Sequence, residues 1–312
     1  MRTPSNNLTV SSLNKKPRGS GVTVFFIGLS SALLILLAAV VYFNYDYFVF
    51  KILIAGNYIY TDALDDIYES SLGEAPNGNY YKNFDDAVIA VFTEKIRAVN
   101  GDGYTYLYTP PQYALSQDNT KREAESAAMN VLADGSLYVR LPNFSTFTRD
   151  FLLKNVETMS KYNKIVFDLR QNPGGDLPAL YDMVGLFLEK GAAIGTEQAK
   201  TPFFTKSYKA GGGDKLSFEK IAVLQDSGTA SASEGFIMAL RENLSNVVVI
   251  GEKSYGKGIG QITVPLKGGF AVKATVIRIL TPLRNSIHKI GIVPDLEYDG
   301  GDILGFTINA LK

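Results

Sequence analysis

Residues 251–258, GEKSYGKG, contain a lysine set among glycines in a way that could support chemistry. Gly251, Gly256 and Lys257 match the pattern G-x-x-x-x-G-K of phosphate-binding loops. Such a loop also needs a serine or threonine after the lysine and a helix whose free amides face the anion. Here Gly258 takes the serine position, and the residues that follow, GIGQITVPL, alternate like a strand. The segment therefore does not predict a nucleotide site, and Lys257 is expected to act on a group other than a phosphate.

A turn rich in small residues, DSGTASASEGFIMAL (226–240), offers that partner. Ser231 stands where this turn meets a predicted helix. Ser231 and Glu234 fit the capping pattern S-x-x-E, so the serine can be interpreted as a plain helix cap. A serine at a strand-to-helix turn can instead act as a nucleophile, with the Ala232 amide donating to a developing oxyanion. The second donor could come from the NPGG loop at 172–175.

Lys257 could serve this serine as a base. The predicted helix advances about 16 Å and the following strand returns about 17 Å, which brings Lys257 back beside Ser231. A lysine base requires a pKa near neutrality, a shift that costs about 4 kcal/mol and that burial among apolar groups can supply. Gln261 could orient the amine without adding a charge. The chain contains one histidine, His288, which lies in a basic turn and is expected to be exposed and not catalytic.

The composition argues against several other classes of site. Among the 312 residues, 31 basic side chains balance 31 acidic ones, so the overall charge does not indicate a nucleic-acid partner. The sequence has no cysteine, which removes thiolate nucleophiles and thiolate metal sites. A single histidine cannot build a His-rich metal site. We expect neither a metal nor an organic cofactor.

The N-terminal part predicts a membrane anchor. The run at 22–43, VTVFFIGLSSALLILLAAVVYF, carries no charge and is long enough to cross a hydrocarbon core about 30 Å thick. A cleaved signal is the alternative, but its apolar region normally has about 7 to 15 residues. Basic residues precede the run, and the first acid, Asp46, follows it. By the positive-inside rule, residues 1–21 form a cytoplasmic tail and the chain after the span lies outside.

The remaining chain predicts an α/β fold in two parts. Residues 44–120 should form a small helical segment, and residues 121–312 should form a core domain of alternating strands and helices with an antiparallel portion near its end. Asp168 and Arg170 are expected to make structural hydrogen bonds. The individual predictions are helices at 62–71, 83–99, around 180–191 and at 232–242, a connection that is not helical at 101–113, a hairpin around Asp134 and Gly135, and strands at 164–169, 221–225, 247–250, 261–266 and 271–280.

Three segments together resemble the C-terminal processing peptidases, also called tail-specific proteases, which use a serine and a lysine. VFDLRQNPGG (166–175) resembles the strand and oxyanion loop of that family, TASASE (229–234) its nucleophile turn, and GEKSYGKGIGQ (251–261) its lysine loop. With LYVRLPNF before them and TPLRNSIHKIGIVPD after them, the resemblance covers about residues 100–298. It implies a crotonase/ClpP-like β-β-α protease core that needs no cofactor.

The resemblance also implies roles for single residues. Ser231 is similar to the family's nucleophile and Lys257 to its general base. The third member of the site stays open between Gln261, which matches the residue that orients the lysine in some members, and Glu234, which matches the residue credited in others.

The implied oxyanion donors are the backbone amides of Ala232 and Gly175, with Gly174 as the near alternative. Family members commonly carry a PDZ domain of roughly a hundred residues between the segments similar to YTPPQY and YVRL. About two dozen residues separate them here, so we expect that this module is missing.

Taken together, these features predict a single-pass protein of the cell membrane that is a serine endopeptidase acting outside the cytoplasm. The resemblance implies that its substrates are proteins or peptides cut near their C-termini, and a homo-oligomer is possible. The alternative is a peptide- or ligand-binding module of the same fold that does not catalyse.

Overall fold

The computed structural model describes residues 20–60, 86–124, 126–213 and 215–312. The chain divides into two compact units, Met1–Tyr45 and Asp46–Lys312. In the first unit, helix α1 (Ser20–Phe43) contains the predicted span. Its stretch Thr23–Phe43 has a mean hydropathy of 2.8 and is not covered by other residues. It is therefore long and apolar enough to cross a membrane, as the sequence predicted.

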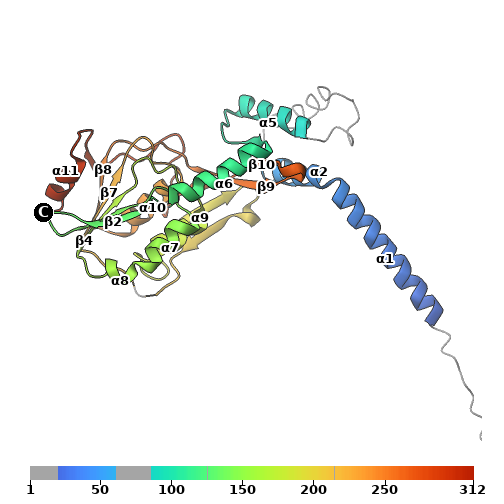
Figure 1. Ribbon diagram of the computed structural model, residues 1–312, viewed down its shortest axis with the longest axis horizontal. Coiled ribbons are helices and arrows are strands. Elements are labelled where there is room, and N and C mark those ends of the chain that lie inside the picture. Colours follow the sequence, from blue (N-terminus) through green and yellow to red (C-terminus); the bar gives the residue numbers. More distant parts are fainter. Residues whose placement is uncertain (1–19, 61–85, 125, 214) are drawn as a thin grey trace, which may run out of the picture. The chain divides into compact units, whose positions relative to one another are not determined.

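A six-stranded sheet forms the centre of the second unit, and it confirms the predicted α/β fold (Figure 1). All neighbouring strands are parallel except β2 and β3, which form the expected hairpin around Asp134 and Gly135. The strand KIVFD is buried on both faces, as is typical of an inner parallel strand. The order across the sheet is β11 (Leu296–Glu297), β8 (Val247–Gly251), β7 (Lys220–Gln225), β4 (Lys164–Asp168), β3 (Leu137–Arg140) and β2 (Ala128–Val131).

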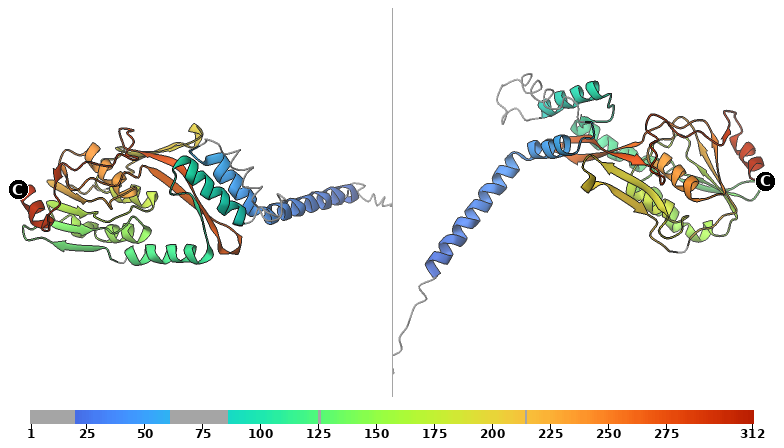
Figure 2. Two further views of the ribbon diagram at one scale, coloured as in Figure 1. Left: turned by 90° about the horizontal axis from the view of Figure 1, so that it is seen from above. Right: turned by 180° about the vertical axis from the view of Figure 1, so that it is seen from behind.

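A second, antiparallel sheet confirms the antiparallel portion predicted near the end of the core. Its long β9–β10 hairpin extends away from the first sheet (Figure 2). Apolar residues of this hairpin share a buried cluster with Phe50, Phe92 and Ile96 from the N-terminal part of the unit. The strands are β1 (Tyr106–Tyr108), β5 (Ala193–Ala199), β6 (Lys206–Lys209), β9 (Ile259–Pro265) and β10 (Ala271–Leu280).

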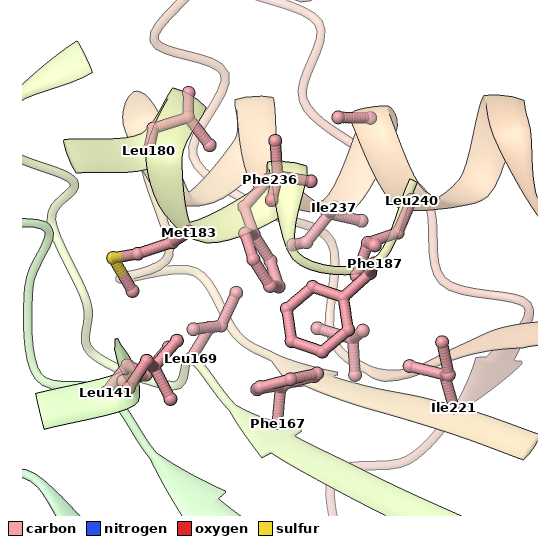
Figure 3. Packing of buried hydrophobic residues seen from close by; sticks show 14 of the residues in the cluster. Leu141, Phe167, Leu169, Leu180, Met183, Phe187, Ile221, Phe236, Ile237 and Leu240 are labelled. Atoms are coloured by element: carbon pink, nitrogen blue, oxygen red, sulfur yellow. The ribbon is translucent and has the colours of Figure 1, made fainter. Parts of the chain in front are cut away.

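Helices cover both faces of the six-stranded sheet because successive strand residues point to opposite sides. On one face, Phe167 of β4 packs against Phe187 and against Phe236 of α10, with ring centroids 5.3 and 5.2 Å apart (Figure 3). On the other face, Val166 and its neighbours pack against α11. The helices of the second unit include α7 (Thr146–Lys154), α8 (Val156–Met159), α9 (Leu177–Gly185), α10 (Ala232–Asn243) and α11 (Ile303–Ala310).

The structure corrects two of the predicted elements. Residues 101–113 were expected to form a connection, but helix α6 (Pro110–Ala124) begins within them, because a proline is well suited to the first turn of a helix. The helix expected to end at 191 ends at Gly185, and Phe187 completes the core from the turns that follow. Strands β5 and β6 were not predicted.

The predicted helix at 83–99 is confirmed as α5 (Asp86–Asn100) over its described part, whereas the one at 62–71 lies outside the described residues. The interval between β1 and β3 is the place where the PDZ domain was expected to be missing, and the described chain contains α6 and β2 there. The described residues also contain short helical segments: α2 (Tyr45–Phe50), a π-helix η1 (Lys51–Ala55), and the 3₁₀ turns η2 (Pro202–Phe204) and η3 (Lys267–Gly269).

The aromatic contacts of Phe236 yield a stability prediction. Phe236 is fully buried, so Phe236→Ala should lower the free energy of unfolding by about 3–5 kcal/mol through the lost burial and the cavity that remains. Urea unfolding of the detergent-solubilised chain measures this loss. Phe147→Ala is the matched control, since the Phe147 side chain is 49% exposed and should cost less than about 1 kcal/mol. Similar losses in both variants would contradict the packing described here.

Candidate active site

Ser231 lies at the turn from β7 into α10, where the sequence predicted a nucleophile or a cap. It is the residue before the first turn of α10, with φ 58° and ψ −118°. Such a positive φ is uncommon for residues other than glycine, and backbone strain of this kind is concentrated at functional sites. The Ser231 side chain is largely buried at the start of the helix.

The NPGG loop packs directly against this turn. A Cβ atom added to Gly174 would lie 2.7 Å from the Ser231 Cβ and 2.8 Å from the Ala232 nitrogen, so only glycine fits there. The carbonyl oxygen of Asn172 accepts hydrogen bonds from the Ala230 amide, at 3.0 Å, and from the Ser233 hydroxyl, also at 3.0 Å. The loop and the serine turn are therefore held at close contact.

The structure distinguishes the candidate oxyanion donors by whether their amides are already engaged. The Gly174 amide donates to Asn172 Oδ1 at 2.9 Å, so it is occupied. Ala232 is the first residue of α10, and the amides of a first helical turn have no acceptor within the helix. Among the described residues, no hydrogen bond uses the Gly175 amide. The amides of Ala232 and Gly175 are therefore available to donate to an oxyanion, and the amide of Gly174 is not.

Glu234 joins the serine turn to the lysine loop. Its fully buried carboxylate accepts hydrogen bonds through Oε2 from the amides of Ser231 and Lys257, both at 2.8 Å. Through Oε1 it accepts from the Gly256 amide at 2.7 Å and from the Ser254 hydroxyl at 2.6 Å. One carboxylate thus fixes both segments that carry the candidate dyad.

Lys257 lies in an environment that favours its neutral form. Burial lowers the pKa of Lys257 and the nearby cation of Lys273 adds to the effect, whereas Glu234 and Asp102 raise it, and together these effects bring the pKa to about 8. Its Nζ lies 4.6 Å from the centre of the Tyr104 ring. After Gly258 the chain enters strand β9 and not a helix, so the loop lacks the architecture of a phosphate site.

Asp102 and Tyr104 come from the aromatic segment that the sequence analysis treated as a connection. The buried Asp102 carboxylate accepts hydrogen bonds from four donors, which are Tyr58 Oη at 3.1 Å, the Tyr104 amide at 3.0 Å, Thr105 Oγ1 at 2.6 Å and Thr275 Oγ1 at 3.2 Å. These bonds hold the Tyr104 ring under the Lys257 amine. An acid between two glycines in an aromatic run was the available signal, but nothing in that run indicates its distant partners.

Gln261 belongs to the same group of polar residues. It faces Thr275 across β9 and β10, and its Nε2 donates to Thr275 Oγ1 at 3.2 Å. Within the described part of the chain, no hydrogen bond joins Gln261 to Lys257. Glu234, in contrast, binds the backbone of Lys257 directly.

A pocket of about 440 Å³ opens beside the lysine loop, lined in part by Tyr104, Tyr255 and His288.

His288 was expected to be exposed, but it is half-buried because its backbone packs against Gly258 and its Nε2 lies 3.4 Å from Tyr60 Oη. Burial lowers the pKa of His288, with the cations of Lys289 and Arg278 adding to the effect. The described residues contain no group of three or more His, Asp or Glu side chains that could bind a metal.

Asp168 and Arg170 make the structural hydrogen bonds that were predicted for them. Arg170 donates to the buried Asp168 carboxylate at 2.9 and 2.7 Å, and Tyr138 Oη donates at 2.6 Å. Burial alone would raise the pKa of Asp168, but the bonds from Arg170 and Tyr138 outweigh it and lower the pKa.

Comparison with known proteins gives consistent matches over the part of the chain that carries the site. The family model described as Peptidase family S41 matches residues 135–298. The sequence is 36% identical over 160 residues to the carboxyl-terminal-processing protease of the cyanobacterium Picosynechococcus, a match covering 51% of this chain and 38% of that protein. It is 33% identical over 161 residues to the chloroplastic carboxyl-terminal-processing peptidase 2 of Arabidopsis thaliana, covering 51% of this chain and 31% of that protein.

The matched part thus spans well under half the length of these curated relatives. Among solved structures, a photosystem II D1 C-terminal processing protease is similar with a TM-score of 0.61 and 19% identity, over 82% of this chain and 92% of that one. A lipoprotein from Streptococcus agalactiae is similar with a TM-score of 0.59 and 15% identity, over 82% and 91%. At these identities the likeness shows a shared fold, and the sequence matches confirm the resemblance to the C-terminal processing peptidases.

The bridge made by Glu234 yields a direct test of what holds the site together. Glu234→Gln keeps the size of the side chain but replaces one acceptor oxygen by a donor that faces the amides already pointing at it. We expect the free energy of unfolding to fall by about 3 kcal/mol or more, because hydrogen bonds to a buried charge are lost. Urea unfolding at neutral pH measures the change.

The control for this variant is Glu157→Gln. The Glu157 side chain is 88% exposed and, among the described residues, pairs with Lys161 alone, so its loss should cost less than about 1 kcal/mol. If Glu234→Gln proved as mild as this control, the carboxylate would not be what fixes the two segments.

Proposed function

The chain belongs to peptidase family S41, and on that basis we propose that it is a membrane-anchored serine endopeptidase using Ser231 and Lys257. The observation that carries the proposal is the Glu234 carboxylate, which binds the backbone of both residues at 2.8 Å. Family membership supports a serine peptidase, and the lowered pKa of Lys257 supports its role as the base.

In the proposed reaction, Ser231 Oγ attacks the carbonyl carbon of the scissile peptide bond, and neutral Lys257 accepts the hydroxyl proton. The amides of Ala232 and Gly175 donate to the oxyanion that develops, since both are free of other acceptors within the described chain. Lys257 then gives its proton to the leaving amine. Water, activated by Lys257, hydrolyses the acyl-enzyme and restores the serine.

The third residue of the site is proposed to be Glu234, which positions Ser231 and Lys257 and does not itself transfer a proton. It contacts the backbone of the dyad, whereas Gln261 binds Thr275. The Lys257 amine lies over the Tyr104 ring, and a chain of hydrogen bonds supports that ring. The Tyr104 amide donates to Asp102, Thr275 donates to Asp102, and Gln261 donates to Thr275. Burial lowers the pKa of Lys257 and the carboxylates of Glu234 and Asp102 raise it, so the value near 8 is a balance of opposed effects.

The crotonase/ClpP-like core, the anchor and the substrate class are proposed on separate grounds. A strand, a serine turn and the helix α10 over a parallel sheet support the core assignment. The apolar stretch Thr23–Phe43 supports a single span, and the basic residues before it support a cytoplasmic N-terminus with the peptidase outside. Cleavage near substrate C-termini is proposed from the names of the relatives.

The assignment of the dyad is tested by substitution in the full-length, reconstituted chain. Ser231→Ala and Lys257→Ala should each reduce cleavage of an unfolded protein substrate by about a thousandfold or more, because the nucleophile or its base is lost. Cleavage is followed by gel and mass spectrometry, and a fluorophosphonate probe should label the peptide that contains Ser231.

Ser233→Ala is the matched control, since Ser233 is buried two residues away and binds the Asn172 carbonyl. It should retain most of the activity. Cleavage by both dyad variants at the parent's rate would refute the assignment, and a parent that binds unfolded protein without cleaving it would favour the silent binding module.

The pH profile tests the identity of the base. Lys257 accepts a proton only when it is neutral, so kcat/KM should rise with pH and reach half its maximum near pH 8. His288→Ala should leave this midpoint unchanged. A midpoint below about 6.5 that disappears in His288→Ala would instead identify His288 as the base, since burial moves the pKa of His288 downward.

A further inference from the structure

The tip of the β5–β6 hairpin exposes two neighbouring phenylalanines. Phe203 and Phe204 in η2 are 87% and 54% exposed, and their rings contact each other with centroids 5.3 Å apart. None of the three residues of η2 is buried. Single exposed apolar side chains are common, but an aromatic pair at a projecting tip contributes little to folding and is typical of an interaction site.

Lysines flank this phenylalanine pair in the sequence. Lys200 precedes it and Lys206 and Lys209 follow it, and the sequence contains no acid between Glu197 and Asp214. An aromatic tip flanked by lysines has the chemistry of elements that bind anionic lipid, with rings entering the boundary between headgroups and acyl chains and amines meeting the headgroup charge. This pattern differs from a protein-binding patch, in which lysine is depleted.

A basic pocket lies against the tip and shares residues with it. The pocket has a volume of about 420 Å³ and includes Lys200 and Pro202 of the tip together with Arg278 of β10 and Arg284. Its described lining contains no acidic residue. Neither Arg278 nor Arg284 forms an ion pair with any residue that the structure describes. The guanidinium groups of Arg278 and Arg284 are well suited to a phosphate group.

The same pocket lies within reach of the proposed anchor. Ile59 lines it and follows Phe43, the last residue of α1, by about 16 residues. Much of this connection is helical in α2 and η1, which limits its length to roughly 35 Å. A bilayer that holds α1 is therefore available to the tip.

We propose that the β5–β6 tip and the basic pocket dock on an anionic phospholipid surface. Phe203 and Phe204 enter the boundary between headgroups and acyl chains, and Arg278 and Arg284 bind the lipid phosphate. This contact is additional to α1, and it rests on the proposed function only in that the anchor supplies the membrane. It would fix the distance of the peptidase unit from the bilayer and hence the reach of Ser231 along a substrate.

The chain has no tryptophan, so one substitution creates a unique fluorescent reporter. Phe203→Trp in the full-length chain is reconstituted into vesicles of phosphatidylglycerol and phosphatidylcholine with brominated acyl chains. We expect blue-shifted emission that is quenched at least twofold relative to vesicles without bromine. Phe147→Trp on α7 is the control for an exposed aromatic away from the tip, and it should show emission typical of water and little quenching.

The charge contribution is tested with the same reporter. Replacing phosphatidylglycerol by phosphatidylcholine, or adding Arg278→Gln and Arg284→Gln, should abolish most of the quenching while α1 still keeps the chain with the vesicles in a flotation gradient. Added inorganic phosphate at millimolar concentration should not reverse the quenching, because the anchored tip meets headgroup phosphates at a much higher effective concentration. Reversal would identify free phosphate as the ligand of the pocket and contradict docking on lipid.

Three further outcomes would overturn the proposal. Emission from Trp at 203 that is unquenched in anionic vesicles, in a chain that floats with them, refutes docking but leaves the anchor and the peptidase intact. A blue shift that depends on protein concentration without bromine quenching would identify a second copy as the occupant. Failure of the chain to float with the vesicles would refute the anchor and the docking together. Ser231→Ala separates docking from catalysis, because this variant should lose cleavage and keep the quenching unchanged.

Discussion

A single buried carboxylate, that of Glu234, determines how the candidate site is assembled. Burying a charge costs several kcal/mol, and the cost is offset here by four donors that all belong to the segments it must join. Three of these donors are backbone amides, which cannot rotate away as side chains can. The serine turn and the lysine loop are therefore bound to the same two oxygen atoms, and a hydrogen bond from the Tyr255 amide to the Thr229 carbonyl oxygen, at 3.0 Å, also joins them directly.

The surrounding fold supplies what this interaction requires. Strand β7 leads to Ser231, helix α10 carries the chain away from it, and strand β8 returns the chain to the lysine loop. The aromatic core formed by Phe167, Phe187 and Phe236 fixes the helix on the sheet. The antiparallel sheet contributes from the other side, where Asp102 and Thr275 support the Tyr104 ring. Lys257 is half-buried where these two parts of the unit meet, and the partial burial lowers its pKa.

Local sequence patterns predicted the parts of the molecule in which neighbouring residues cooperate. The turn at Asp134 and Gly135, the apolar strand β4 and the start of α10 were predicted because each pattern is complete within a few residues. Strands β5 and β6 were missed, since their weak alternation is stabilised by pairing with β10 and with each other. Asp102 and Tyr104 were missed for a similar reason, because their partners Thr275 and Lys257 lie more than a hundred residues away in the sequence.

The account depends most on a lowered pKa of Lys257, which lets its amine lose a proton close to physiological pH, and the titration of this side chain can be observed directly. NMR of the chain labelled with ¹³C at lysine Cε, with the Lys257 signal assigned by its loss in Lys257→Arg, would follow this group as pH is raised. A midpoint of about 8 is the expected result. A midpoint near 10.4, the ordinary value for lysine, would mean that the amine stays protonated and cannot accept a proton from Ser231.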